Sequence, residues 1–142
     1  MERATWMGIL AQSDAAELAQ LAAPWLDTPV TVQRAPEIGT AMVRGRMGGT
    51  GGAFNLGEVT VVRCSVSTQT GLTGHAYVQG RDKTKAKHCA LLDALLQGPE
   101  GESLQSQVIQ PLQSSLAEKR DIESRKAAAT QVDFFTLARG ED

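Results

Sequence analysis

The sequence predicts a single α+β domain in which N-terminal and C-terminal helices pack on one face of a four-stranded antiparallel sheet. Three observations lead to this prediction. Apolar residues recur at helical spacing towards both ends of the chain, they alternate with polar residues in the middle, and turn residues separate the alternating stretches at short intervals. Helices and strands segregated along a chain are typical of an α+β sandwich. The length suits one domain, and we expect it to span residues 1–142.

Residues 2–23 predict two consecutive helices. Apolar residues from Trp6 to Leu10 make the face of the first, and Leu18 begins the face of the second. Ser13 stands before an acidic first turn, which is typical of a helix N-cap, and Pro24 ends the helical run.

Four strands are expected between residues 29 and 80. Residues 29–47 read as two strands around a short connection at 35–39, and residues 57–80 read as two more, separated by the turn residues 70–74. Closely spaced strands of this kind predict an antiparallel meander.

Residues 81–98 carry the strongest helical pattern, which ends at Gly98-Pro99. A polar helix is expected over 102–130. Pro111 must kink or restart this helix, because proline lacks the amide hydrogen that the preceding turn would accept.

Composition excludes several classes of function. The net charge of −2 argues against a duplex-DNA binder, so no nucleic-acid partner is expected. No run of apolar residues is long enough to span a membrane, and the N-terminus does not resemble an export signal. We therefore expect a cytoplasmic protein. Cys64 and Cys89 are expected to be buried free thiols.

Basic residues gather where the 81–98 helix begins, at Arg81, Lys83, Lys85 and Lys87. The positive end of the helix dipole makes this placement unfavourable, although Asp82 can cap the helix. The cluster indicates either a bound anion or an acidic partner; a solvated basic face is the alternative.

A glycine-rich loop raises the same question. Arg44 and Arg46 precede it, and backbone N–H groups around Gly48, Gly49, Thr50 and Gly51 could surround a phosphate. The loop has no Gly-Lys-Ser/Thr ending and is followed by a strand, so it is neither a Walker loop nor a dinucleotide fingerprint. A hairpin tip is an equally good interpretation.

The residues predict no catalytic set and no metal site within this chain. His75 and His88 have no carboxylate partners at zinc-ligand spacing. His88 and Cys89 are adjacent on a helix, so their side chains point about 100° apart and do not favour a nucleophile pair. Trp6 and Trp25 are expected to be core or interface anchors.

Several segments together resemble one family. In order along the chain they are "RMGGTGGAFNLGEVTVVR", "GHAYVQGRDKTKAKHCALLDALLQ", "VIQPL" and "VDFFTLARG". They closely resemble the PhnG family, the G subunits of the bacterial carbon–phosphorus lyase core complex. The resemblance covers residues 44 to 142, with a looser match over the N-terminal helices.

The resemblance implies a subunit of the enzyme that makes alpha-D-ribose 1-methylphosphonate 5-triphosphate. Such a complex transfers the ribose triphosphate moiety of ATP to an alkylphosphonate and releases adenine. The implied partners are the H, I and J subunits, with the L subunit functionally required. The I subunit is regarded as the catalytic chain, so ATP is the substrate of the complex and no cofactor is expected in this chain.

Two hypotheses follow. In the first, the chain is an accessory subunit, and residues 131–142 dock a partner through Phe134 and Phe135; packing of these rings on the chain's own sheet is the alternative. In the second, the chain is a free-standing phosphate- or nucleotide-binding module that uses the glycine loop and the basic helix start. A self-associating chain is a third option.

Overall fold

A computed structural model describes residues 1–46 and 53–140, with the side chains of 1–42 and 57–130. The fold is α+β, as predicted. Its elements, in chain order, are α1 (Arg3–Gln12), α2 (Ala15–Ala22), the 3₁₀ turn η1 (Ala23–Trp25), β1 (Val30–Arg46), β2 (Ala53–Thr68), β3 (Thr73–Gln79), α3 (Lys83–Leu96), α4 (Gly101–Leu104), the π-helical segment η3 (Gln105–Ile109) and α5 (Gln110–Gly140).

The sheet has three antiparallel strands in the order β1-β2-β3, so the prediction of four strands is wrong. The two strands expected in residues 29–47 are one strand, β1. Its pairing with β2 shifts register between Val32 and Arg34 and again between Arg34 and Glu37, and Pro36 lies within the second shift. An edge strand tolerates proline at such an irregularity, because the missing amide hydrogen breaks no ladder bond.

The N-terminal helices form as predicted, but their boundary lies one residue later. Asp14, and not Ser13, caps α2, since its carboxylate accepts a hydrogen bond from the Glu17 amide at 3.1 Å. The Ser13 hydroxyl instead donates to the Leu10 carbonyl at 2.7 Å, at the end of α1. Either residue suits an N-cap, and only the path of the backbone decides between them.

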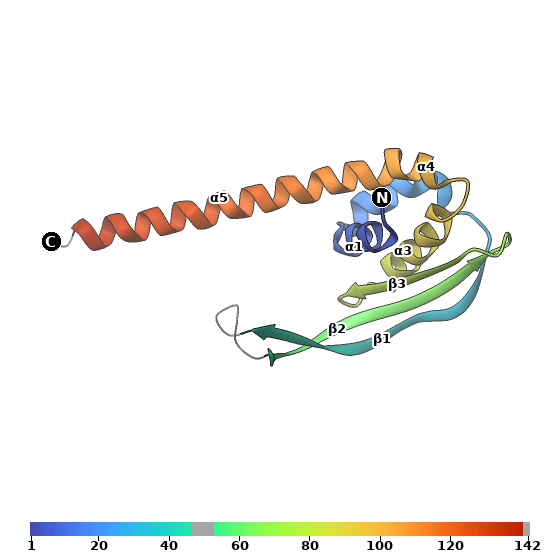
Figure 1. Ribbon diagram of the computed structural model, residues 1–142, viewed down its shortest axis with the longest axis horizontal. Helices are drawn as coiled ribbons and strands as arrows, with labels where there is room; N and C mark the ends of the chain where they lie inside the picture. Colours follow the sequence, from blue (N-terminus) through green and yellow to red (C-terminus); the bar gives the residue numbers. More distant parts are fainter. Residues whose placement is uncertain (47–52, 141–142) are drawn as a thin grey trace.

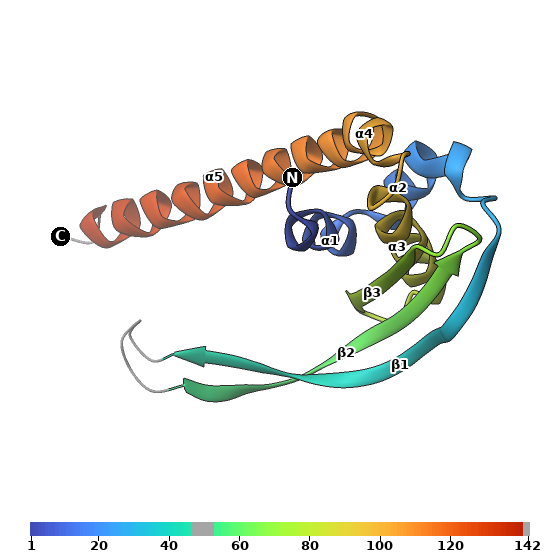
Figure 2. The same ribbon diagram turned by 45° about the vertical axis from the view of Figure 1, so that its right-hand side comes forward.

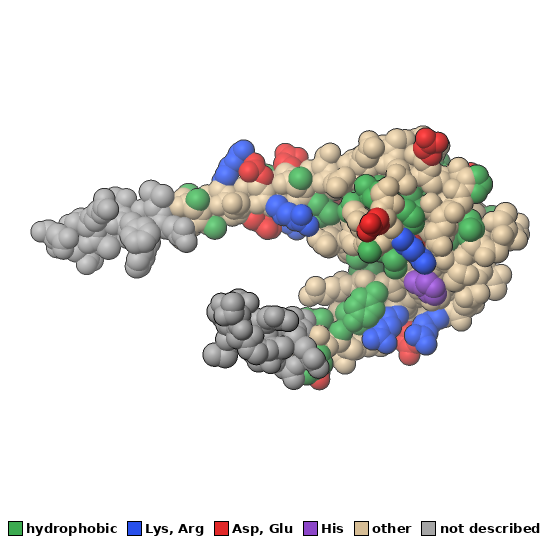
Figure 3. Space-filling view, viewed as in Figure 1, with side chains coloured by type: hydrophobic (Ala, Val, Ile, Leu, Met, Phe, Trp, Pro, Cys, Tyr) green, Lys and Arg blue, Asp and Glu red, His purple; other side chains and the backbone are tan. Residues whose placement is uncertain are grey.

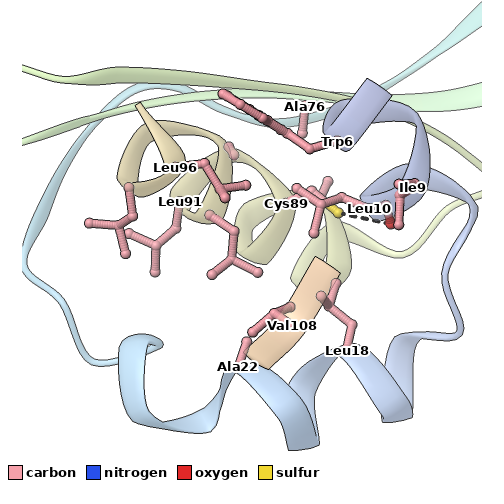
Figure 4. Close-up of a cluster of buried hydrophobic side chains, with 14 of the residues drawn as sticks. Trp6, Ile9, Leu10, Leu18, Ala22, Ala76, Cys89, Leu91, Leu96 and Val108 are labelled. Atoms are coloured by element: carbon pink, nitrogen blue, oxygen red, sulfur yellow. Dashed lines mark hydrogen bonds between the residues drawn. The ribbon is translucent and has the colours of Figure 1, made fainter. Parts of the chain in front are cut away.

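One face of the sheet packs on α3, and α1 covers the neighbouring edge at β3. Gly74 in β3 lets the strand approach α3 closely, because a Cβ placed there would lie 1.9 Å from the Ala90 carbonyl oxygen. Figure 4 shows the core, where Leu10 of α1, Leu18 of α2 and Val108 of η3 point towards α3. Leu10, Leu18 and Leu92 are at most 1% exposed.

Of the helices that follow the sheet in the chain, α3 packs on it as predicted, whereas the later ones pack mainly on the N-terminal helices. Segment η3 packs on α2 and α1, and α5 leaves the core along α1. The α-helix restarts at Pro111, as predicted: the π-helical segment η3 ends at Ile109, and Pro111 is the second residue of α5. Proline is tolerated in the first turn of an α-helix, where its missing amide hydrogen breaks no intrahelical bond.

Two long elements extend from the core in the same direction (Figures 1 and 2). One is α5, a helix of 31 residues. The other is the hairpin of β1 and β2, which continues to the pair Arg46 and Ala53 after β3 has ended opposite Val61. We call α5 beyond Leu116 the helical arm, and the two-stranded part of β1 and β2 the hairpin arm.

Within the described ranges, no helix is both long enough and apolar enough to cross a membrane.

Candidate functional site

A cleft of about 640 Å³ lies where the two arms meet the core. We call it the arm cleft. The space-filling view shows the molecule hollowed between α5 and the sheet (Figure 3). Its lining comes from five elements: Ala11 and Gln12 of α1, Val59 and Val61 of β2, Tyr77 and Gln79 of β3, Lys85 of α3, and Leu116, Lys119, Arg120 and Glu123 of α5.

Lys85 reaches the arm cleft from the first turn of α3. Its ammonium donates a hydrogen bond to the carbonyl oxygen of Ala11 at 2.8 Å, in the last turn of α1. The carbonyl end of a helix carries partial negative charge, so a cation is stabilised there. The charge of Lys85 is therefore unfavourable at the start of its own helix, α3, but it stabilises the carbonyl end of α1.

Contacts between α5 and the N-terminal helices hold the upper wall of the arm cleft. The Arg120 guanidinium donates to the side-chain oxygen of Gln12 at 3.1 Å. One turn earlier, the Ser115 hydroxyl donates to the Glu17 carboxylate at 2.6 Å. These contacts set where α5 leaves the core, and therefore the width of the cleft.

Two strands contribute the sheet residues that line the arm cleft, β2 and β3. Val61 pairs with Gln79, and Arg63 pairs with Tyr77, so these four side chains share one face of the sheet. The Arg63 guanidinium lies over the Tyr77 ring, 5.3 Å from its centroid. Tyr77 is 49% exposed, which leaves the rest of its ring available for contact.

The predicted basic cluster is divided between two sides of α3. Arg81 and Lys85 line a groove of about 420 Å³ that continues from the arm cleft. Lys83 and Lys87 line a separate pocket of about 440 Å³ with Asp27 and His88. Asp82 caps α3 as predicted, accepting from the Lys85 amide at 2.9 Å. The cluster is thus not one site.

The glycine loop lies outside the described residues at Gly48, Gly49, Thr50 and Gly51. The described strands on either side of it end at the pair of Arg46 and Ala53. Arg44 and Arg46 are in β1, Phe134 and Phe135 are in α5, and the side chains of all four lie outside the described set. Their proposed roles stay predictions.

The histidine and cysteine side chains do not form a nucleophile pair. Burial raises the pKa of Cys89 to about 12, so this thiol is protonated at neutral pH. Its sulfur lies 3.5 Å from the Leu10 carbonyl in the core, whereas His88 lines the pocket with Lys83. Cys64 and Cys89 are buried free thiols, as expected. In the described ranges, no group of three or more histidine, cysteine or carboxylate side chains is arranged to hold a metal ion.

Asp93 is the main buried charge that the sequence analysis did not identify. It is 0% exposed and accepts four hydrogen bonds: two from the Arg3 guanidinium at 2.8 and 3.2 Å, one from the Trp6 indole at 2.8 Å, and one from the His75 amide at 2.9 Å. It therefore joins α1, β3 and α3. The signal was its position on the apolar face of α3, where an unpaired carboxylate would be costly.

Lys119, Arg120 and Tyr77 were also missed. The sequence places both cations on a polar helix, where a solvated surface is the simplest interpretation. The available signal was Leu116, an apolar residue in this polar helix that packs against the core and so shows which side of the helix faces it.

The family model described as phosphonate metabolism protein PhnG matches residues 1–140. A curated protein of Rhizobium meliloti (strain 1021), named alpha-D-ribose 1-methylphosphonate 5-triphosphate synthase subunit PhnG, is 40% identical over 146 aligned residues. The alignment covers 99% of this chain and 91% of that protein.

Proposed function

The chain belongs to the PhnG family of phosphonate metabolism proteins, and we propose that it is an accessory, non-catalytic subunit of an alpha-D-ribose 1-methylphosphonate 5-triphosphate synthase. The name of the Rhizobium meliloti relative supports membership of a multi-subunit enzyme. In the proposed reaction, the complex transfers the ribose triphosphate moiety of ATP to an alkylphosphonate and adenine leaves. The H, I, J and L subunits are the proposed partners.

The two arms are the observation that carries this proposal. All residues from 117 to 130 of the helical arm are exposed. The hairpin arm is a two-stranded ribbon, which is marginally stable in water without further packing. A chain that places this much regular backbone outside its own core is built to complete its packing on another molecule.

The residues of the described core support an accessory role. The buried carboxylate Asp93 is fully engaged by Arg3, Trp6 and His75, and it joins elements of the fold. The Cys89 thiol is protonated and enclosed. These groups stabilise the fold, so the proposed contribution of the chain is assembly, with residues 131–142 as one docking segment.

A phosphate- or nucleotide-binding module is the second candidate. The pocket that contains Lys83, Lys87 and His88 favours it, because two cations converge there beside the start of α3. Asp27 lines the same pocket and opposes an anion. The two candidates differ in what the isolated chain does with ATP.

One set of experiments separates them. We expect the isolated chain to show no calorimetric ATP binding at micromolar concentration and to co-purify with co-expressed H, I and J subunits. A chain that ends at Thr130 should keep its thermal midpoint and lose partner binding. Micromolar ATP binding that is weakened by Lys83→Ala would support the module instead. A full-length chain that stays monomeric beside those subunits would contradict the accessory role.

A further inference from the structure

We propose that the arm cleft binds a segment of a protein partner that presents apolar and acidic side chains together. The proposal rests on the proposed function, because the partner is another subunit of the same synthase. It goes further by giving the place of contact and the chemistry of the segment that binds there.

The apolar part of the arm cleft is made by neighbouring elements. Val59 on β2, Tyr77 on β3 and Leu116 on α5 all line it, and each is at least partly exposed. Half of Tyr77 is exposed, so its ring offers area that this chain does not cover. Exposed tyrosine beside aliphatic side chains is typical of the centre of a protein interface. A volume of about 640 Å³ accommodates several side chains of a partner.

The charged part of the arm cleft is positive. Lys85, Lys119 and Arg120 line it, against the single carboxylate Glu123. The whole chain has a net charge of −2, so this excess is local and does not reflect the overall composition. A local charge of one sign at an interface selects partners of the opposite sign and orients them as they approach. The matching groups are aspartate and glutamate.

Two of the three cations are held in place. Lys85 donates to the Ala11 carbonyl and Arg120 donates to the Gln12 side chain. Each therefore uses part of its donor capacity within the chain, and each keeps its charge directed at the arm cleft. This arrangement suits single carboxylates that dock against an already ordered surface, since less side-chain entropy is lost on binding.

The surroundings favour a protein segment over a small anion. The arm cleft opens between the helical arm and the hairpin arm (Figure 3), and each arm carries exposed apolar residues. Ile122 on α5 is 42% exposed and Met42 on β1 is 52% exposed. A peptide that leaves the cleft therefore meets further apolar surface, whereas a phosphate would use only the cations.

Charge reversal tests the proposal. The chain carrying Lys119→Glu and Arg120→Glu is compared with wild type and with the matched control Lys126→Glu, which makes the same kind of change on α5 outside the arm cleft. Affinity for the co-expressed H, I and J subunits is measured by interferometry at 50 and 300 mM salt. We expect the double variant to bind at least tenfold more weakly and to lose most of the salt dependence, while the control binds as wild type does.

A photo-crosslinking residue at position 77 identifies the occupant. We expect it to label one partner peptide that contains aspartate or glutamate beside apolar residues. Labelling of a second copy of this chain, or of a peptide without carboxylates, would overturn the proposal. Unchanged affinity of the double variant for the subunits would also overturn it. So would a double variant that still assembles with the subunits but no longer binds tripolyphosphate, because the cleft would then be a site for a small anion.

The controls separate folding from binding. Urea unfolding of each variant shows whether the core is intact. If the double variant does not fold, Lys119→Gln replaces it, and we expect a smaller but measurable loss of affinity for the subunits. Unchanged affinity of Lys119→Gln would count against the proposed role of the arm cleft. If the wild-type chain binds none of the subunits, the proposed function fails. If the wild-type chain binds them and the variants bind equally well, only the proposed role of the arm cleft fails.

Discussion

The core and the two arms differ in how far their side chains are buried and in what stabilises them. In the core, side chains such as Leu18, Leu92 and Leu104 are completely buried, and one carboxylate joins three elements. In the helical arm, residues 117–130 are all exposed. Tertiary packing holds the core, whereas local preference holds the arm. The difference teaches that this chain folds around α3 and leaves most of its longest elements outside the core.

The helical arm shows what local preference alone provides. Its sequence is rich in alanine, glutamate, lysine and arginine, which favour helix. One intrahelical ion pair, Arg125 to Asp121 at 2.7 Å, adds about 0.3–0.5 kcal/mol. Exposed helices without packing are marginal in water. The arm should therefore be the first part of the chain to lose structure on heating, ahead of the core.

The largest expected contrast concerns two aspartates. Asp93→Ala removes the acceptor for the buried Trp6 indole and the His75 amide, and should lower the free energy of unfolding by about 3–5 kcal/mol. Asp121→Ala removes only the exposed ion pair on α5 and should cost under about 0.5 kcal/mol. Urea unfolding measures both. Similar losses for the two variants would show that the core does not depend on Asp93.

Two glycines give the next contrast. A Cβ at Gly74 would lie 1.9 Å from the Ala90 carbonyl and 2.6 Å from the Ala94 nitrogen, so Gly74→Ala must push β3 away from α3. We expect a loss of about 1–3 kcal/mol or more. At Gly39, on β1, nothing lies within 4 Å of the same position, and Gly39→Ala should be nearly neutral. Equal thermal midpoints for the two variants would contradict the close approach.

A smaller effect is expected on the open face of the sheet. The Arg63 guanidinium over the Tyr77 ring should contribute about 0.5–1 kcal/mol of coupling. A double-mutant cycle with Arg63→Gln and Tyr77→Leu measures it in urea. Strict additivity of the two single changes would show that the pair is only a neighbour contact. The same Tyr77→Leu change should reduce partner binding more than it reduces stability.

The smallest effect is a pH dependence from His88. Burial is the main cause that lowers the pKa of this imidazole below its ordinary value of 6.5; the Asp82 carboxylate partly opposes the shift, and the Lys87 charge adds to it. The unfolded chain therefore binds the proton more readily, so this contribution to stability is complete above pH 6.5 and is lost as the pH falls through the folded pKa. The free energy of unfolding is measured for wild type and for His88→Gln between pH 7.5 and pH 5. The difference, wild type minus variant, should decrease as the pH is lowered. A flat difference would contradict this.

Local patterns predicted much of the secondary structure. The helix over 81–98 was found because its apolar spacing, the Asp82 cap and the Gly98-Pro99 ending agree with one another. The fourth strand was predicted wrongly, because Pro36 looks like a turn when the edge position of β1 is not known. Pro111 correctly marked the restart of the helix, but the π-helical segment before it was not predicted, since a π-helical turn cannot be recognised from one residue.

The sequence by itself determined the α+β class and the Asp82 cap of α3, because these depend on residues close together in the chain. Only the tertiary structure decided the rest. It brought Asp93 to Trp6, 87 positions away, and it placed Lys85 at the end of α1. It also set α5 opposite the sheet and so created the arm cleft. Such contacts join residues distant in sequence, and their partners are chosen by how helices and strands pack.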